Sequence, residues 1–128
     1  GEDGTILRVP HQRDESIFMD GPKVFVEAIR GMITMLEQAC KLSGRTVNDL
    51  SLVVPHQANL RIIEAITLKL KAPKDFLYSN IREYGNTSSS TIPICLERLL
   101  GERKSGEVLG LTAFGGGFTF GGAVIQIV

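Results

Sequence analysis

The sequence predicts an α/β domain in which helices cover a mixed sheet. Apolar residues recur at helical spacing in several segments, whereas residues 50–54 form a nearly continuous apolar run before Pro55. Two further apolar runs flank the glycines at 115–117. A short continuous run is typical of a strand buried on both faces, and its alternation with helical segments indicates a layered α/β domain.

The N-terminal region contains two short apolar runs, at 5–9 and 16–19, each an edge strand or an extended lead-in. From Pro22 onwards, apolar residues fall three and four positions apart, which predicts an amphipathic helix. Proline is favoured in the first helical turn, and the Ser-Gly pair at 43–44 is a suitable stop.

The middle of the chain alternates between strand and helix. The run 50–54 predicts a buried strand, the spacing over 60–70 predicts a helix, and residues 76–78 predict a brief strand. The segment 85–88 has the glycine, asparagine and serine of a turn, and 92–100 predicts a further short helix.

The C-terminal region has the clearest β pattern. Apolar runs at 108–113 and 118–128 are separated by the glycines at 115–117. This arrangement predicts an antiparallel hairpin, because two strands joined by a glycine turn are usually neighbours in a sheet. No internal repeat or low-complexity stretch occurs in the chain.

The composition is that of an ordinary globular domain. The 128 residues are 43% hydrophobic, and 14 basic residues balance 14 acidic ones, which argues against a general nucleic-acid-binding surface. No apolar run approaches the roughly 18–20 residues that span a bilayer, and residues 1–4 lack the features of a signal peptide. Cys40 and Cys95 lie in apolar helical patterns, as expected for buried thiols in a reducing compartment. We therefore expect a cytoplasmic protein without a membrane segment.

His56 is the first candidate for chemistry, because it stands where the buried strand gives way to a helix. Residues at the carboxyl ends of strands in α/β sheets commonly face the ligand crevice. A helix N-terminus also disfavours the protonated imidazole, so a neutral ring that donates one hydrogen bond is expected. The alternative is that His56 merely begins a helix.

Asn86 and the triple glycine are the other candidates. Asn86 lies between Gly85 and Thr87, and it either forms a turn or offers its amide as a fixed donor to a carbonyl oxygen. Residues 115–117 either make a tight turn or let backbone N–H groups approach a substrate oxygen. The sequence has no metal-ligand cluster, dinucleotide fingerprint or phosphate-binding loop.

Four motifs in the chain together carry a family resemblance. They are Met-Asp-Gly at 19–21 followed by Phe25, Val-Val-Pro-His-Gln-Ala-Asn-Leu-Arg-Ile at 53–62, Tyr-Gly-Asn-Thr-Ser-Ser at 84–89, and Ala-Phe-Gly-Gly-Gly-Phe-Thr-Phe-Gly at 113–121. In this order they resemble the pantetheine-tunnel, histidine, asparagine and closing glycine motifs of β-ketoacyl-acyl-carrier-protein synthase III. Any one motif is weak evidence, whereas the four together are specific.

The resemblance implies a thiolase-like fold, in which two similar α/β halves each contain a mixed five-stranded sheet covered by helices. This chain would form the second half over residues 16–128, with residues 1–15 as a lead-in or linker from the first half. The family's nucleophilic cysteine belongs to that first half, and neither Cys40 nor Cys95 matches its motif. The chain does not begin with Met, as expected for part of a longer protein, although a tag scar gives the same start.

The implied activity is an acyl transfer with decarboxylative Claisen condensation. A primer acyl group, usually acetyl from coenzyme A, condenses with malonyl-acyl carrier protein to give a 3-oxoacyl-acyl carrier protein, which initiates fatty-acid synthesis. The resemblance implies acyl carrier protein, acyl-CoA and the first half as partners, and neither a metal nor an organic cofactor. It also implies a homodimeric full-length enzyme and an isolated chain that is inactive.

The resemblance assigns roles to individual residues. His56 and Asn86 would donate hydrogen bonds to the malonyl thioester oxygen, and the Gly116 backbone N–H would hold the oxyanion on the acyl-cysteine. Positions along the pantetheine arm are matched by Gly21, Phe25, Ala58 and Asn59. Basic positions that attract the acidic carrier protein are matched by Arg61 and Lys69.

Two other interpretations stay open. A relative of the same fold could condense or transfer another acyl group in secondary metabolism, and the serines at 89–90 and Phe120 depart from the usual family residues in ways that could change the acyl-chain preference. A non-catalytic domain could instead bind carrier protein or a pantetheine thioester. A plant-type polyketide synthase is disfavoured, because the closing glycine motif of that group normally contains a proline that residues 115–117 lack.

Overall fold

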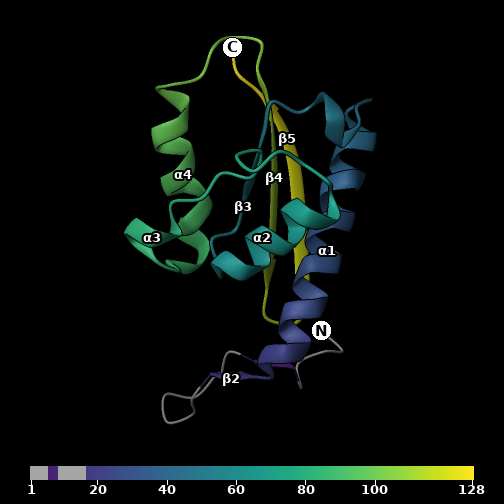
Figure 1. The fold of residues 1–128 in the computed structure, drawn as a ribbon, viewed down its shortest axis with the longest axis vertical. Helices are drawn as coiled ribbons and strands as arrows, with labels where there is room; N and C mark the ends of the chain where they lie inside the picture. Colours follow the sequence, from purple (N-terminus) through teal and green to yellow (C-terminus); the bar gives the residue numbers. More distant parts are fainter. Residues whose placement is uncertain (1–5, 9–16) are drawn as a thin grey trace.

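A computed structural model describes residues 6–8 and 17–128 of the chain. The described residues run from a short strand pair near the N-terminus to a long hairpin at the C-terminus (Figure 1). In chain order the elements are β1 (Leu7–Arg8), β2 (Phe18–Met19), α1 (Gly21–Leu42), the 3-10 helix η1 (Val47–Asp49), β3 (Leu52–Pro55), α2 (Leu60–Lys69), α3 (Ile81–Tyr84), the 3-10 helix η2 (Ser88–Ser90), α4 (Thr91–Leu100), β4 (Val108–Gly115) and β5 (Thr119–Gln126). No helix among the described residues is both long enough and apolar enough to cross a membrane.

The central sheet is mixed, with the strand order β3-β4-β5. β3 runs parallel to β4, with Leu52 opposite Leu109. β4 runs antiparallel to β5, with Val108 opposite Gln126. The predicted mixed sheet and the predicted C-terminal hairpin are therefore confirmed, and the hairpin is part of the larger sheet.

The described part of the sheet has three strands, whereas the family resemblance predicted five. The segment 76–78, predicted as a strand, forms a single parallel bridge between Leu77 and Val53. Two backbone hydrogen bonds of 2.8 Å join this segment to Val53. The next bond of this ladder would need an N–H at position 55, which is a proline, and the Tyr78 carbonyl accepts from the Gln57 side chain at 3.2 Å instead. The strands β1 and β2 pair with each other rather than with the central sheet.

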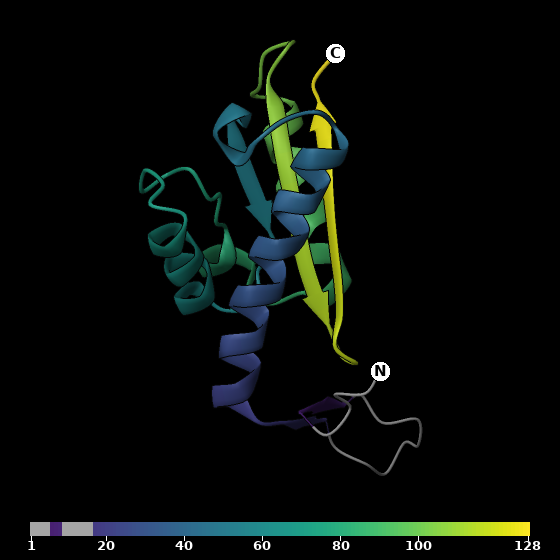
Figure 2. The same ribbon diagram turned by 90° about the vertical axis from the view of Figure 1, so that its right-hand side faces the viewer.

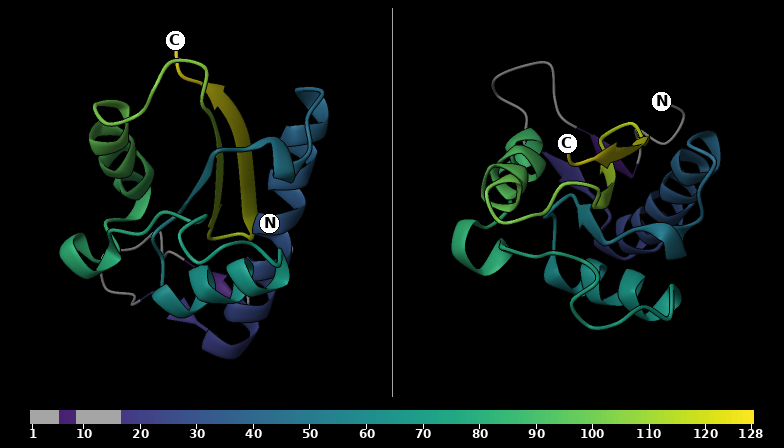
Figure 3. Two further views of the ribbon diagram at one scale, coloured as in Figure 1. Left: turned by 45° about the horizontal axis from the view of Figure 1, so that its top comes forward. Right: turned by 90° about the horizontal axis from the view of Figure 1, so that it is seen from above.

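Helices cover both faces of the sheet, as the views from the side and from above show (Figure 2, Figure 3). The alternating side chains of β3 separate two layers of core. Val53 packs in the cluster formed with α1 and α2, whereas Leu52 and Val54 pack in the cluster formed with α4. All four residues of β3 are buried, as its continuous apolar run predicted. This burial fixes the end of β3, directly before His56.

The long helix α1 begins and ends close to where the sequence predicts. The Asp20 side chain caps its first turn, which contains Pro22. At the other end Gly44 has a φ of 70°, and the Arg45 N–H donates to the Cys40 carbonyl at 2.8 Å. Glycine adopts a positive φ without steric cost, so this turn satisfies a carbonyl that the helix end would leave free.

Three short helical turns, η1, α3 and η2, were not predicted from the sequence. Each has four residues or fewer, which is too short for an apolar period to appear. The predicted helix at the C-terminal side of η2 is confirmed as α4. Residues 1–5 and 9–16 lie outside the described residues, and most of the predicted lead-in falls among them.

Candidate active site

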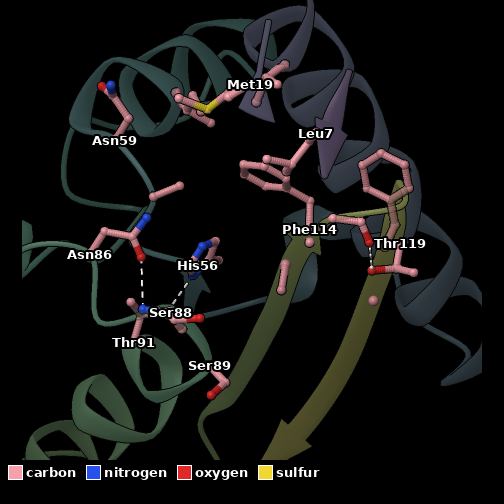
Figure 4. Close-up of a pocket in the computed structure, with 18 of the residues that line it drawn as sticks. Leu7, Met19, His56, Asn59, Asn86, Ser88, Ser89, Thr91, Phe114 and Thr119 are labelled. Carbon is pink, nitrogen blue, oxygen red and sulfur yellow. Dashed lines mark hydrogen bonds between the residues drawn. The ribbon is translucent and has the colours of Figure 1, made fainter. Parts of the chain in front are cut away.

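A cavity of about 960 Å³ opens at the carboxyl ends of β3 and β4 (Figure 4). The start of α1, the loop after β3, the segment around η2 and the β4–β5 hairpin all contribute to its wall. The carboxyl ends of parallel strands are the usual location of ligand crevices in α/β sheets. Most lining residues are apolar or glycine, and a few polar side chains, including His56, Asn86 and Thr91, face the same space.

His56 is fixed through both its backbone and its ring. Its N–H donates to the Thr112 carbonyl at 2.8 Å, which continues the β3–β4 ladder by one residue. The ring atom Nδ1 lies 2.6 Å from Thr91 Oγ1, and the Phe114 ring meets the imidazole edge-on at 5.6 Å. Burial lowers the pKa of His56 below its usual 6.5. The imidazole is therefore neutral at pH 7, as predicted.

The cause of this neutral state differs from the expected one. The sequence placed His56 at a helix N-terminus, but α2 begins only at Leu60, with Asn59 as its N-cap. The macrodipole effect falls off within the first helical turn. Removal of the ring from water is the dominant cause, because a buried imidazole loses the hydration that stabilises its charge.

Gln57 supports the loop that carries His56 and was missed as a functional residue. Its side chain is completely buried and donates to the Pro55 carbonyl at 2.8 Å and to the Tyr78 carbonyl at 3.2 Å. Its Oε1 accepts from the Asn80 N–H at 3.1 Å. A polar residue two positions after a buried strand was the sequence signal for this role.

Asn86 faces the cavity from the loop between α3 and η2 (Figure 4). Gly85, with a φ of 67°, turns the chain out of α3. The Asn86 Oδ1 accepts from the Ser88 N–H at 2.9 Å. Because only the oxygen of an amide can accept this bond, the Nδ2 group keeps its two donors for other partners. The loop is exposed on the protein surface.

The structure brings most of the other predicted site residues to the same cavity. Arg61 stands beside the cavity, with its guanidinium 5.9 Å from the centre of the Phe25 ring. Lys69 lies in the last turn of α2 and does not line the cavity. Asn59 also has a structural role, since its side chain caps α2 by accepting from the Arg61 N–H at 2.9 Å. The predicted positions that line the cavity are Gly21, Phe25, Ala58, Asn59 and Gly116.

The two cysteines are buried thiols, as predicted. Burial raises the pKa of Cys95 to about 11, and burial also raises the pKa of Cys40. Neither cysteine lines the cavity. Among the described residues, no group of three or more His, Cys, Asp or Glu side chains is arranged to hold a metal ion. Neither cysteine is therefore placed to act as a nucleophile in this cavity.

A family model for the C-terminal region of 3-oxoacyl-[acyl-carrier-protein (ACP)] synthase III matches residues 40–127. The chain belongs to the synthase III family. A β-ketoacyl-[acyl-carrier-protein] synthase III of Roseiflexus sp. (strain RS-1) is 40% identical over 117 residues, which are 90% of this chain and 36% of that protein.

Solved structures agree with this assignment. The chain superposes on the 3-oxoacyl-[acyl-carrier-protein] synthase III of Aquifex aeolicus VF5 with a TM-score of 0.90 and 37% identity, covering 98% of this chain and 41% of that one. It also superposes on the priming β-ketosynthase of the R1128 polyketide biosynthetic pathway with a TM-score of 0.86 and 31% identity, covering 99% of this chain and 42% of that one. The predicted thiolase-like fold is thus confirmed, and the chain spans about two fifths of the synthase III proteins that it matches.

Proposed function

We propose that this chain supplies the histidine and asparagine of a synthase III active site that performs decarboxylative Claisen condensation. The observation that carries the proposal is the convergence of His56 and Asn86 on one largely apolar cavity. Each side chain is tethered through one polar atom, His56 Nδ1 to Thr91 and Asn86 Oδ1 to Ser88. The other polar atom of each is left for a substrate oxygen.

The proposed reaction begins with transfer of a primer acyl group from coenzyme A to a cysteine sulfur, which releases free coenzyme A. Malonyl-acyl carrier protein then loses carbon dioxide, and the electron pair of the broken bond forms an enolate at the thioester. The enolate carbon attacks the acyl-cysteine and expels the thiolate, giving a 3-oxoacyl-acyl carrier protein. We propose that the cysteine lies in the part of the full-length enzyme that this chain does not span.

In this scheme His56 and Asn86 donate to the malonyl thioester oxygen, on which negative charge grows during decarboxylation. Fixed donors stabilise that charge more in the transition state than in the ground state, which is what raises the rate. The Gly116 backbone N–H is proposed to hold the oxyanion formed on the acyl-cysteine. The scheme stabilises charge with hydrogen-bond donors and includes no metal or organic cofactor.

The pantetheine arm is proposed to enter past the start of α1 and the loop after β3. The residues proposed to line it are Gly21, Phe25, Ala58 and Asn59, and their places on the cavity wall support the assignment. The exposed side chains of Arg61 and Lys69 lie on the neighbouring helix α2, where they can attract an acidic carrier protein. We further propose that residues 16–128 form the C-terminal domain, that residues 1–15 lead in from the rest of the enzyme, and that the full-length enzyme is a cytoplasmic homodimer.

The first test measures decarboxylation of malonyl-acyl carrier protein and its condensation with acetyl-CoA by the full-length enzyme. The variants His56→Ala and Asn86→Ala should each lower kcat by roughly 100- to 1,000-fold, the usual result of removing one oxyanion donor. Asn48→Ala, at an exposed position in η1, is the matched control and should leave kcat unchanged. Full activity of the His56 or Asn86 variant would contradict the proposed roles.

The docking assignment has a test of its own. Arg61→Glu and Lys69→Glu should raise the KM for malonyl-acyl carrier protein more than the KM for acetyl-CoA, because an acidic carrier protein presents an extended negative surface, whereas coenzyme A presents only its phosphates. Added salt should reduce the difference in the KM for malonyl-acyl carrier protein between each variant and the unaltered enzyme. Lys104→Glu, at an exposed position before β4, is the control.

A second candidate function has a specific observation in its favour. The 31% identity with the R1128 priming β-ketosynthase is compatible with a synthase that acts in secondary metabolism. Comparing acetyl-CoA with longer and branched acyl-CoA primers in the same assay separates the two candidates. Binding of a pantetheine thioester without any condensation would instead support a non-catalytic binding domain.

A further inference from the structure

Thr91 is in direct contact with the candidate histidine, His56. It is the first residue of α4 and is 3% exposed. Its hydroxyl oxygen lies 2.6 Å from His56 Nδ1 and 3.0 Å from the Ser88 carbonyl oxygen. Figure 4 shows the contact between this hydroxyl and the ring, and Thr91 is one of the residues that line the cavity.

The hydroxyl has one hydrogen for these two acceptors, and the Ser88 carbonyl does not need it. That carbonyl already accepts a hydrogen bond from the backbone N–H of Thr91. If the hydroxyl donates to His56, the Ser88 carbonyl therefore still has a hydrogen-bond donor. If it donates to Ser88 instead, the imidazole must place its proton on Nδ1 and donate to the Thr91 oxygen.

The two distances favour donation from Thr91 to His56. Donor and acceptor atoms are commonly about 2.7–3.2 Å apart when an N–H donates to an oxygen and about 2.5–3.0 Å apart when a hydroxyl donates to an oxygen. The separation of 2.6 Å between Thr91 Oγ1 and His56 Nδ1 is shorter than the usual range for the His56 ring N–H donating to the hydroxyl oxygen. The separation of 3.0 Å to Ser88 is at the long limit for a hydroxyl donor.

We propose that Thr91 is a positioning residue that holds neutral His56 in the tautomer with its proton on Nε2. This inference rests on the proposed function, because the Nε2 proton is the one that His56 would donate to the thioester oxygen. With the proton on Nδ1, Nε2 would be an acceptor and would repel a developing oxyanion. The hydroxyl of Thr91 thus decides whether the ring can act as a donor.

The same turn sets the orientation of the second donor. The Ser88 N–H binds Asn86 Oδ1, which leaves the Nδ2 donors of Asn86 for the cavity. Ser88 has a φ of 56°, in the left-handed region that residues with a side chain rarely adopt. One short segment, 88–91, therefore orients the asparagine through a backbone N–H and the histidine through a hydroxyl.

The experiment compares the full-length enzyme with its Thr91→Val and Thr91→Ser variants. Nitrogen-15 spectra of the histidine-labelled enzyme distinguish protonated from unprotonated ring nitrogens, and the His56→Gln variant assigns the His56 signals by their absence. The unaltered enzyme and Thr91→Ser should carry the proton on Nε2, whereas Thr91→Val should give a mixture of tautomers. Thr91→Val should also lower kcat about tenfold with little change in KM, the equivalent of one ordinary hydrogen bond, and Thr91→Ser should restore it.

Thr67→Val is the structural control, because it removes a hydroxyl that donates to the Ile63 carbonyl at 2.9 Å in α2, outside the cavity wall. It should change neither the spectrum nor kcat. A proton on Nδ1 in the unaltered enzyme would overturn the proposal, even if Thr91→Val fails to fold. If the proton is on Nε2 but the enzyme has no condensation activity, the role of Thr91 in setting the tautomer is supported. Only the proposed function is then contradicted.

Discussion

The two candidate donors are held by regions of opposite character. His56 follows a strand that is buried along its whole length, and the side chain after it, Gln57, is fully buried with three hydrogen bonds. Asn86 lies in an exposed loop whose course is set by Gly85 and by Ser88, both with positive φ. The strand end is fixed by core packing, whereas the loop is fixed by a few local hydrogen bonds.

Because of this difference, substitutions in the two regions should affect stability and activity in different proportions. Substitutions beside His56 disturb buried polar groups, so they should cost stability as well as activity. Substitutions in the Asn86 loop affect groups that water can reach, so they should cost activity with little loss of stability. The free energy of unfolding of the full-length protein measures this contrast.

The largest effect is expected for Gln57→Leu. The substitution leaves the Pro55 and Tyr78 carbonyls and the Asn80 N–H without the partner that Gln57 provides. We expect the free energy of unfolding to fall by about 3 kcal/mol, since each unsatisfied buried group costs about 1–3 kcal/mol. Urea unfolding followed by circular dichroism measures the change. Gln38→Leu, at an exposed position of α1, is the control, and an equal loss in both variants would refute the special role of Gln57.

A smaller loss is expected for Asn59→Ala, because Asn59 caps α2. Removal of an N-cap side chain should lower the free energy of unfolding by about 1 kcal/mol. Asn59→Asp keeps an oxygen acceptor at the same place and should retain most of the stability. If the alanine and aspartate variants unfold at the same urea concentration, the cap contributes nothing measurable.

Asn86→Ala should change stability less than Asn59→Ala does. Its side chain accepts an exposed hydrogen bond from the Ser88 N–H, and water can replace this donor. We expect a loss of about 0.5 kcal/mol, measured by the same urea unfolding. A loss as large as that for Gln57→Leu would mean that the loop, like the strand end, depends on Asn86 for its fold.

The smallest effect is expected from the protonation of His56, whose ring is only half-buried. Because its pKa is lowered in the folded state, the unfolded chain binds the proton at a higher pH than the folded chain does. The contribution of neutral His56 should be complete above about pH 6.5 and be lost as the pH falls from there through the lowered pKa. Unfolding of the unaltered protein and of His56→Gln over this range measures it, and identical pH profiles would contradict the prediction.

The fold could be predicted in outline because its main elements have strong periodic signals. Apolar residues recur at helical spacing in α1, α2 and α4, and β3 is a continuous apolar run. A loop shows neither pattern. The short turn α3 and the 3-10 turn η2 have no such period. The strand predicted at 76–78 is only a single bridge, because Pro55 has no N–H to continue the ladder and the Gln57 side chain donates to the Tyr78 carbonyl instead.

The candidate site was predicted by its residue types but not by its contacts. His56 and Asn86 could be proposed from their neighbours in the sequence. Thr91 could not, because its contact with His56 joins residues 35 positions apart. The family motifs also gave no reason to expect that burial, rather than a helix N-terminus, keeps His56 neutral.

The sequence by itself determined the order of the longer strands and helices, the buried character of β3 and the motif residues at its end. Those properties depend on local periodicity and on residue chemistry, which a linear chain displays directly. Only the tertiary structure decided that the end of β3 and the turn 88–91 face one cavity, and that Thr91 reaches the ring of His56. The reason is physical: hydrogen bonds between distant segments exist only after core packing on both faces of the sheet has brought those segments together.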